Sequence, residues 1–426
     1  MKNHPEAIQG GTLIQNKIRA FAMQKRSLLI CLNLMISFPA LADWSGNIAF
    51  QQRYFLNDPQ SLNPLQHNSY ASIAAETEYY ASWDDQNKSI TVKPFVRLDQ
   101  YDDERSHGDV RELSYQQVFE NWELRVGISK VYWGVTESQH LVDVINQTDN
   151  IENVDGEDKL GQPIIKASME RDWGNLDVFV LPYFRERTFQ DIEGRPRTAL
   201  IVDTDQASYE SSDEQQHMDY ALRWFNYLGD LELGLSYFNG TSREPLFIPG
   251  TRNSEAVLTP YYPLMQQVGL DAQLTTEEWL WKLEVISRDW QATDSNNALL
   301  DQRYLALTGG FEYTFVGIAD SDADLGLVSE YLYDDRDQQA TSFFQNDVLV
   351  ALRLAMNDAQ STEALFGVIY DLDMGEILLS LEASRRFAGN WTATLEARSF
   401  NRTDSGSLLN SIAHDDFIQL DIAYYF

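Results

Sequence analysis

The sequence predicts a transmembrane antiparallel β-barrel of about 18 strands, with 16 as the alternative count. Three observations lead to this fold class: segments that alternate apolar and polar residues, connections that are alternately short and long, and aromatic residues beside the short connections. No apolar run in the 426 residues approaches the roughly 18–20 residues of a spanning helix, and the mean hydropathy is −0.38. A helical membrane protein is therefore excluded.

The first 42 residues have the pattern of a secretory signal peptide preceded by an extension. Lys25 and Arg26 form a basic region, the apolar stretch 27–38 follows, and Ala40-Leu41-Ala42 provides an A-x-A cleavage site. The apolar stretch is too short to span a bilayer as a stop-transfer helix. We therefore expect residues 1–42 to be removed on export.

Removal of this segment leaves a single mature domain. We expect translation to start at Met23, and the mature chain, residues 43–426, to begin at Asp43. Cys31 is the only cysteine, so the exported domain has neither a disulfide nor thiol chemistry. An exported domain without cysteine is typical of a bacterial envelope, where folding does not depend on disulfides.

The charge and aromatic content exclude two further classes. The chain has 65 Asp and Glu residues against 32 Lys and Arg, a formal net charge of −33, and nucleic-acid binding requires a basic surface instead. Disorder is excluded because the chain contains 10 Trp, 21 Tyr and 21 Phe residues. The sequence therefore predicts a structured, acidic protein with no nucleic-acid partner.

Strict alternation is clearest at the C-terminus. The apolar positions Ile418, Leu420, Ile422, Tyr424 and Phe426 are separated by single residues. This period of two gives a strand one apolar and one polar face. Residues 90–99, 231–237 and 391–398 follow the same pattern. Each segment is expected to place its apolar face outward and its polar face inward.

The connections between these segments have two lengths. Short connections fall near 84–88, 120–121, 174–175, 229–230, 275–277, 319–323, 357–360 and 388–390. Long polar ones lie between them, near 56–68, 102–109, 133–161, 188–216, 239–262, 289–302, 334–342 and 403–415, together with a brief turn at 373–375. Short periplasmic turns, long extracellular loops and an even strand number are typical of an outer-membrane barrel.

The positions of aromatic residues support the prediction of a membrane barrel independently. Eight of them lie within a few residues of a short connection: Trp83, Trp122, Trp173, Tyr227, Trp279, Phe315, Phe387 and Trp391. Amphipathic rings prefer the boundary between water and lipid, so a ring of them marks one edge of the membrane. Aromatic residues of a soluble core would not gather beside short turns.

These features resemble the Gram-negative outer-membrane porins over the whole mature chain. The stretch 125–134, which ends in Trp133-Gly134, and the stretch 143–149, with Asn146 and Asp149, resemble a family of uncharacterised porin-like barrels. Members of that family carry Trp-Gly-Glu and then an Asn-Pro-x-Asp-type segment. Here Val135 follows Gly134 in place of Glu, and Gln147 follows Asn146 in place of Pro, so the match is partial.

The resemblance implies a location and a function. It implies a barrel in bacterial outer-membrane lipid that lets small hydrophilic or amphiphilic solutes diffuse passively, as a monomer or a trimer. It also implies that Tyr424 and Phe426 form the signal read by the barrel assembly machinery. The alternative is a structural or adhesin barrel that scaffolds a partner, and a barrel hydrolase is the least favoured interpretation.

The polar faces of the predicted strands give a wet interior with charges of both signs. Inward bases include Arg353 and Arg398, and inward acids include Glu284 and Glu330. An 18-stranded barrel is wide enough for an aqueous channel, so such residues select what passes.

The third long loop, 133–161, is the candidate constriction. Thr136 and Gln139 form a capping-box pattern that predicts a short helix, in which Leu141, Val144, Ile145 and Thr148 share one face. An apolar face should not meet water, so we expect the loop to fold inward, as the third loop of general porins does. A solvated acidic lid is the alternative.

The predicted constriction pairs loop acids with bases on the wall. The loop acids are Glu137, Asp143, Asp149, Glu152 and Asp155, and the bases are Arg97, Arg125, Arg185 and Arg223. Opposed charges in a narrow aqueous passage create a transverse field that orients dipolar solutes.

No cofactor and no defined metal site are expected. The acidic stretch 149–158 does not fit an EF-hand loop, because Ile151 would occupy the first ligand position, so the acidic loops offer only loose binding of divalent cations. No catalytic site is expected either, because no Gly-x-Ser-x-Gly motif occurs and the pair Ser138 and His140 lacks an orienting acid.

Overall fold

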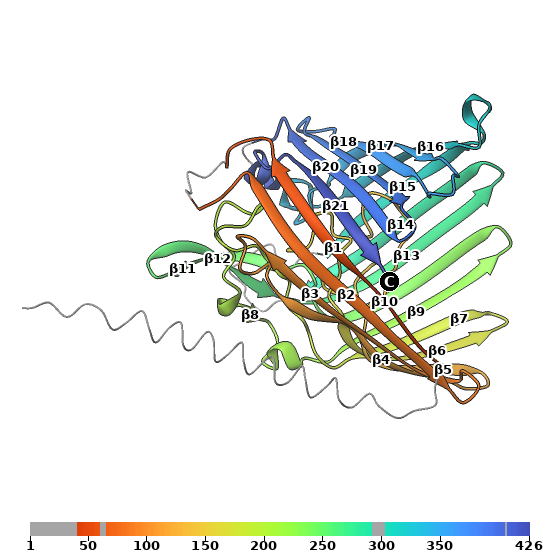
Figure 1. Ribbon diagram of the computed structural model, residues 1–426. Coiled ribbons are helices and arrows are strands. Elements are labelled where there is room, and N and C mark those ends of the chain that lie inside the picture. Colours follow the sequence, from red (N-terminus) through yellow and green to blue (C-terminus); the bar gives the residue numbers. More distant parts are fainter. Residues whose placement is uncertain (1–40, 60–64, 292–302, 405–406) are drawn as a thin grey trace, which may run out of the picture. The chain divides into compact units, whose positions relative to one another are not determined.

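The chain forms a closed antiparallel β-barrel of 18 strands (Figure 1). The computed structural model describes residues 41–59, 65–291, 303–404 and 407–426, and the predicted signal peptide lies outside them except for its last two residues, Leu41 and Ala42. Each barrel strand pairs with its neighbours in the chain, and the first strand also pairs with the last. The predicted fold class and the count of 18 are therefore confirmed.

The barrel strands are β1 (Leu41–Phe55), β2 (Ser69–Trp83), β3 (Lys88–Asp99), β4 (Gly108–Val118), β5 (Trp122–Ser129), β6 (Gln162–Arg171), β7 (Gly174–Leu181), β9 (Asp219–Leu228), β10 (Leu231–Thr241), β13 (Leu264–Thr276), β14 (Trp279–Gln291), β15 (Arg303–Phe315), β16 (Asp324–Asp334), β17 (Asn346–Ala355), β18 (Glu363–Asp371), β19 (Ile377–Phe387), β20 (Trp391–Asn401) and β21 (Phe417–Tyr425). Outside the barrel wall, β8 (Ser208–Tyr209), β11 (Leu246–Arg252) and β12 (Glu255–Tyr262) form a small sheet. No helix among the described residues is long and apolar enough to cross a membrane.

The connections alternate as the sequence predicts. Those near 84–88, 229–230 and 388–390 are tight turns, and the long connections all open at the other end of the barrel. The brief turn at 373–375 joins β18 to β19 at the long-loop end, as expected. In Figure 1 the β11–β12 hairpin projects from this end.

The barrel closes where β1 meets β21. The register runs from Asn47 opposite Tyr425 to Phe55 opposite Phe417, and Gly46 exchanges two backbone hydrogen bonds with Phe426, at 3.1 and 3.0 Å. Only glycine fits at position 46, because a Cβ there would lie 2.6 Å from the Glu76 carbonyl oxygen. Closure pairs the backbone groups that an open edge would leave unsatisfied in lipid.

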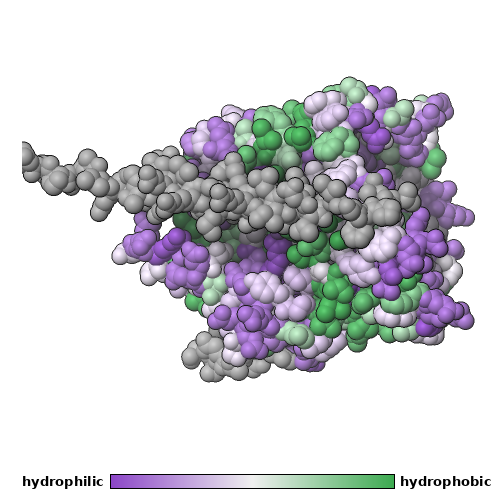
Figure 2. Space-filling model, turned by 60° about the horizontal axis from the view of Figure 1, so that its bottom comes forward, coloured by the Kyte–Doolittle hydropathy of each residue, from purple (hydrophilic) through white to green (hydrophobic). Residues whose placement is uncertain are grey.

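The outer face of the barrel is apolar between two aromatic ends. The eight aromatic residues predicted beside short turns are all exposed on the outside. At the long-loop end most of the exposed rings are tyrosines: Tyr54, Tyr132, Tyr183, Tyr220, Tyr237, Tyr331, Tyr333 and Tyr370. On the part of the surface that is visible in Figure 2, hydrophobic residues lie between hydrophilic ends. An apolar band with an aromatic ring at each edge is the surface that a bilayer requires.

The inner face is packed at one end and open at the other. Along β13 the inward residues Met265, Gln267 and Asp271 are each 1% exposed, whereas Gln273, nearer the short turn, is only partly buried. β15 shows the same gradient. The half of the lumen nearest the long loops is therefore filled by protein, and the other half is accessible to water.

Deletion of Phe426 should lower the yield of folded barrel. Its ring contacts Tyr424, and its backbone makes the last two hydrogen bonds between β1 and the C-terminus, so the deletion weakens closure and the predicted assembly signal together. The fraction of heat-modifiable protein on semi-native gels measures the effect. Phe315→Ala is the control, because it removes a similarly exposed ring on β15, away from the closure. Equal yields of the deletion and the control would contradict this prediction.

Candidate functional site

The β5–β6 loop, residues 130–161, crosses the inside of the barrel. Asp149 lies 2.6 Å from Arg111 on β4, whereas Glu137 lies 2.5 Å from Arg353 on β17 and donates its backbone N–H to Glu330 on β16. β16 is the ninth strand from β4 in the ring of 18, so the two walls face each other. The loop therefore contacts opposite sides of the lumen.

Two buried wall carboxylates hold the first part of this loop. Glu284 on β14 accepts hydrogen bonds from the backbone N–H groups of Val135 and Thr136, at 2.7 and 3.0 Å, and from the Thr136 hydroxyl. Glu330 accepts from the N–H groups of Glu137 and Ser138, at 2.7 and 2.9 Å. Charged acceptors make the stronger kind of hydrogen bond, and both side chains are almost fully buried.

The helix predicted from the capping box is absent, and residues 136–148 form turns and irregular backbone instead. The Thr136 hydroxyl oxygen lies 2.7 Å from Glu284 and 2.6 Å from the carbonyl oxygen of Gln139, both acceptors for its one hydrogen, so it caps no helix. Because the wall acids satisfy successive N–H groups, the segment needs no internal helical hydrogen bonds. This prediction was wrong, and the reason lies in residues far away in the sequence.

The expectation that the apolar face of the loop avoids water holds for Val144 and Ile145, whereas Leu141 and Thr148 are partly buried. Val142, Val144 and Ile145 are at most 1% exposed. They join Trp133 in a cluster with inward residues of the wall: Ile164, Phe179, Leu181, Ala221, Phe238, Met265, Ile286, Trp290, Tyr304 and Ala306. The cluster fills the lumen beside β6 to β15. Gly269 makes room for Val142, since a Cβ at Gly269 would lie 3.1 Å from it.

Ion pairs close the opposite side, beside β3 and β4. Glu152 makes three hydrogen bonds with Arg97, the shortest 2.7 Å, and Asp149 pairs with Arg111. Burial alone would raise the pKa of Glu152, but Arg97 and the neighbouring arginines outweigh burial and lower it. These partners touch directly and are buried, so no water-filled gap separates them.

Arg111 owes its position to a β-bulge. The register between β3 and β4 shifts there, with Lys93 opposite Glu112 and Pro94 opposite Val110, so Arg111 has no partner residue across the strand pair. A bulge changes the direction in which a side chain points, and here it directs Arg111 to Asp149. Simple alternation gives no signal for this residue, and our sequence analysis missed it.

A segment of the β7–β9 loop covers these pairs from the long-loop end. The Thr188 hydroxyl donates to Asp149, and Gln190 donates to the Asn150 carbonyl oxygen. Arg195, whose side chain is fully buried, reaches Asp415 at 2.8 Å in the β20–β21 loop. The segment therefore links the rim above β7 and β9 to the rim near β21, and it lies over the lumen beside β1 to β4.

Three of the four predicted wall bases do not pair with an acid of the loop. Among the described residues Arg125 bonds Gln116, Arg185 pairs with Asp109, and Arg223 pairs with Asp271 at 2.7 Å. Arg185 also lies in the β7–β9 loop and not on a strand. Of the four bases predicted for the constriction, only Arg97 meets a loop acid, whereas the inward bases Arg353 and Arg398 meet Glu137 and Asp155.

The remaining predicted loop acids differ in exposure. The Asp143 side chain is 1% exposed and lies 3.6 Å from Lys159. Asp155 pairs with Arg398 at 3.1 Å and is 20% exposed, and Glu137 is 23% exposed. Glu157 was not among the predicted site residues. Its side chain is 55% exposed, more than that of the other five loop acids in these ion pairs, Glu137, Asp143, Asp149, Glu152 and Asp155. Charge presented to water therefore comes from Glu137, Asp155 and Glu157.

Several of these groups have shifted pKa values. Burial raises the pKa of Asp143 and of Asp155 to about 6, and it raises the pKa of Asp158 to about 7. Hydrogen bonds to Glu157 and Glu284 raise the pKa of His140 to about 10. Asp143, Asp155 and Asp158 therefore lose their charge between pH 8 and 5, while His140 stays protonated.

Two groups of acids could in principle hold a metal ion. His107, Asp149 and Glu152 form one, and Asp155, Glu382 and Glu396 form the other. In the first group arginines already pair with Asp149 and Glu152, and Arg398 bonds all three acids of the second. These arginines supply the positive charge that a cation would bring, so neither group fits a resident metal. The expected loose binding of divalent cations stays a prediction.

Ser138 and His140 do not form a nucleophile–base pair in the described structure. The Ser138 hydroxyl donates to Glu330 at 2.6 Å, and His140 lies beside Glu157 and Glu284. Both side chains therefore serve to fix the loop to its surroundings.

No family model matches the chain, and no curated protein matches it. Among solved structures, it is similar to a loop-deletion mutant of OmpT, an outer membrane protein of Vibrio cholerae, with 11% identity over 91% of this chain and 100% of that chain and a TM-score of 0.45. It is also similar to a mutant of Rh. blastica porin, with 11% identity over 91% and 100% of the two chains and a TM-score of 0.43.

Glu284→Gln should loosen the β5–β6 loop. The substitution keeps the side-chain volume but removes the charge and one acceptor oxygen, and a lost hydrogen bond to a buried charged group costs about 1.5–3 kcal/mol. Limited proteolysis should then cut between residues 135 and 142, where the wild-type loop resists. Glu232→Gln, on the inner face of β10, is the control, because Glu232 makes no bond to the loop within the described ranges. Equal resistance of both variants would show that Glu284 does not hold the loop.

Proposed function

We propose that this chain is a porin-like channel of the bacterial outer membrane, through which small hydrophilic or amphiphilic solutes diffuse passively. In this proposal the β5–β6 loop forms the constriction. The observation that carries it is the contact of one loop with facing walls of a closed barrel, through Asp149 on one side and Glu137 on the other. A chain segment inside a barrel must narrow whatever path the barrel offers.

The outer surface supports residence in a membrane. Its apolar band lies between a ring that includes Trp173 and Trp279 at the short-turn end and a ring of tyrosines at the long-loop end. In bacterial barrels short turns face the periplasm and long loops face outward. The proposed orientation therefore places the filled half of the lumen outermost and the water-accessible half toward the periplasm.

The charges that face water favour cations. Glu137, Asp155 and Glu157 are loop acids with side chains at least 20% exposed, whereas Arg97 and Arg111, on β3 and β4, are buried in ion pairs. Charges of one sign in a narrow aqueous passage raise the local concentration of the opposite ion. We therefore expect a channel that prefers cations and catalyses no reaction.

A barrel that scaffolds a partner is the second candidate. The packing of the long-loop half favours it, since the apolar cluster and the buried ion pairs leave little open cross-section there. The two candidates differ in conductance. A scaffold would bind a partner and leave a planar bilayer sealed, whereas the channel conducts without one.

Deletion of residues 137–157 should raise single-channel conductance. The deletion removes the segment that spans the lumen. The open cross-section of the lumen therefore widens, and water can fill the long-loop half of the barrel as well as the short-turn half. Planar-bilayer recording of the purified protein gives the measurement. Shortening the β11–β12 hairpin by removing residues 251–256 is the control, because the hairpin projects away from the lumen. Unchanged conductance after the first deletion would place the constriction elsewhere, and no conductance in either protein would favour the scaffold.

Cation preference should fall as the pH is lowered from 8 to 5. Acids with a raised pKa are charged above that pKa and neutral below it, so Asp158 loses its charge near pH 7 and Asp155 near pH 6. The reversal potential in a KCl gradient reports the preference at each pH. The double variant Asp155→Asn, Asp158→Asn should start with a lower preference and change less. A wild-type preference that is constant from pH 8 to 5 would contradict the proposed charge of the passage.

A further inference from the structure

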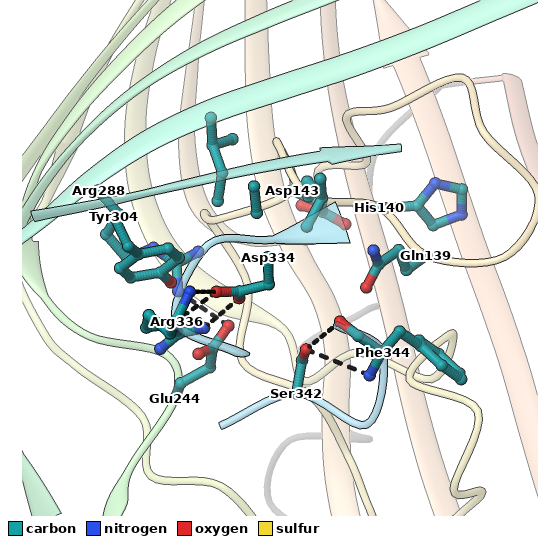
Figure 3. Close-up of a pocket in the computed structure, with 13 residues that line it drawn as sticks. Gln139, His140, Asp143, Glu244, Arg288, Tyr304, Asp334, Arg336, Ser342 and Phe344 are labelled. Carbon is teal, nitrogen blue, oxygen red and sulfur yellow. Dashed lines mark hydrogen bonds and ion pairs between the residues drawn. The ribbon is translucent and has the colours of Figure 1, made fainter. Parts of the chain in front are cut away.

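A small cavity lies between the β5–β6 loop and the barrel wall (Figure 3). Its volume is about 110 Å³. Loop residues Gln139 to Asp143 form one side of it, strands β14 to β16 form the wall, and the β10–β13 and β16–β17 loops complete it. At ~30 Å³ for a water molecule, the cavity has room for three or four groups of that size.

One charged group in this lining has no hydrogen bond. The Asp143 carboxylate is 1% exposed, and neither of its oxygens has a hydrogen-bond partner among the described residues. The Lys159 ammonium, 3.6 Å from Oδ2, is near enough to pair electrostatically but too far to donate a hydrogen bond. A buried carboxylate without donors is costly, so donors from a further molecule would be favourable there.

The other charged side chains that line the cavity are already paired, and among them the protonated His140 lies 3.3 Å from Glu157 and 3.8 Å from Glu284. Arg288 bonds Glu244 at 2.8 Å, and Arg336 bonds Asp334 through two nitrogens, at 2.9 and 2.6 Å. In Figure 3 these pairs lie together on one side of the cavity and Asp143 lies on another. An anion would have to displace Glu244 or Asp334, whereas a cation finds free acceptors at Asp143.

The rest of the lining sets the size and shape of the occupant. Leu141, Ile286 and Phe344 are apolar, and the Ser342 hydroxyl already donates to the Phe344 carbonyl oxygen. A compact head with N–H donors and a short alkyl group therefore matches the cavity better than a bare metal ion, which would need several oxygen ligands at once.

We propose that this cavity binds a small primary ammonium compound, with its N–H groups donated to Asp143 and its alkyl group against the apolar lining. The proposal deepens the proposed function, because it names a class of cationic solute held beside the passage, and it rests on that function for the route by which the solute arrives. The bound ammonium compound competes with the Lys159 ammonium, which lies 3.6 Å from the same Asp143 carboxylate.

Calorimetric titration of the detergent-solubilised, folded barrel with methylammonium tests the proposal. The wild-type protein should bind it, and Asp143→Asn should abolish binding. Lys159→Met removes the competing charge with little change of volume and should tighten binding by roughly tenfold. Asp155→Asn is the matched control, since Asp155 belongs to the same loop but not to the cavity. Heat modifiability of each variant confirms that it is folded.

Three results would overturn the proposal. The first is the absence of methylammonium binding by both the wild type and Lys159→Met. This result would mean that water or Lys159 alone compensates the charge of the Asp143 carboxylate. The second is equal binding by Asp143→Asn. The third is equal binding of tetramethylammonium, which has no N–H donor and is larger, since this would indicate general attraction to the acidic surface. The titration does not depend on conductance, so the two proposals can fail separately. Binding without conductance would reject the channel but not the cavity site, and conductance without binding would reject the cavity site but not the channel.

Discussion

The buried carboxylates of Glu284 and Glu330 are the constraint on which the interior of this barrel depends. A chain segment that leaves the wall and enters the lumen carries backbone N–H groups that need acceptors. These two side chains provide them for four consecutive residues, 135–138, at distances between 2.7 and 3.0 Å. Once this part of the loop is fixed to β14 and β16, its apolar residues meet the wall and its acids reach the arginines beyond. The carboxylates thus determine where the rest of the loop can lie.

The interior that results is unequal along the barrel axis. Toward the long loops, apolar packing around Ile145 fills one side and buried ion pairs such as Glu152 with Arg97 fill the other. Toward the short turns, inward residues such as Glu78 remain partly exposed. This gradient fits a channel with a narrow outer half and a wide inner one, and it also explains why a scaffold is the competing interpretation. Whether the barrel is a channel or a scaffold depends on the width of the passage that remains beside the β5–β6 loop.

The acidic composition is largely compensated where the protein is densest. The arginines Arg97, Arg111 and Arg398 each meet carboxylates of the β5–β6 loop or of the wall beside it. A charge transferred from water to such a site requires a partner at close range. The excess of acids therefore appears at exposed positions such as Glu157. Asp143 is a buried acid without such a close partner, because the neighbouring Lys159 lies beyond hydrogen-bond distance.

The sequence by itself determined the barrel, the faces of its strands and the two lengths of connection, and it favoured 18 strands with 16 left as the alternative. These features are local: a period of two and an aromatic ring beside a turn, such as Trp173, can be recognised within a dozen residues. It also indicated that the third long loop would bury its apolar side chains. Only the tertiary structure decided that this loop is not helical, that a bulge directs Arg111 to Asp149, and that Arg125 and Arg223 pair with other residues. Each of these outcomes depends on which residues the closed ring of strands brings together, and that is fixed by register and closure over the whole chain.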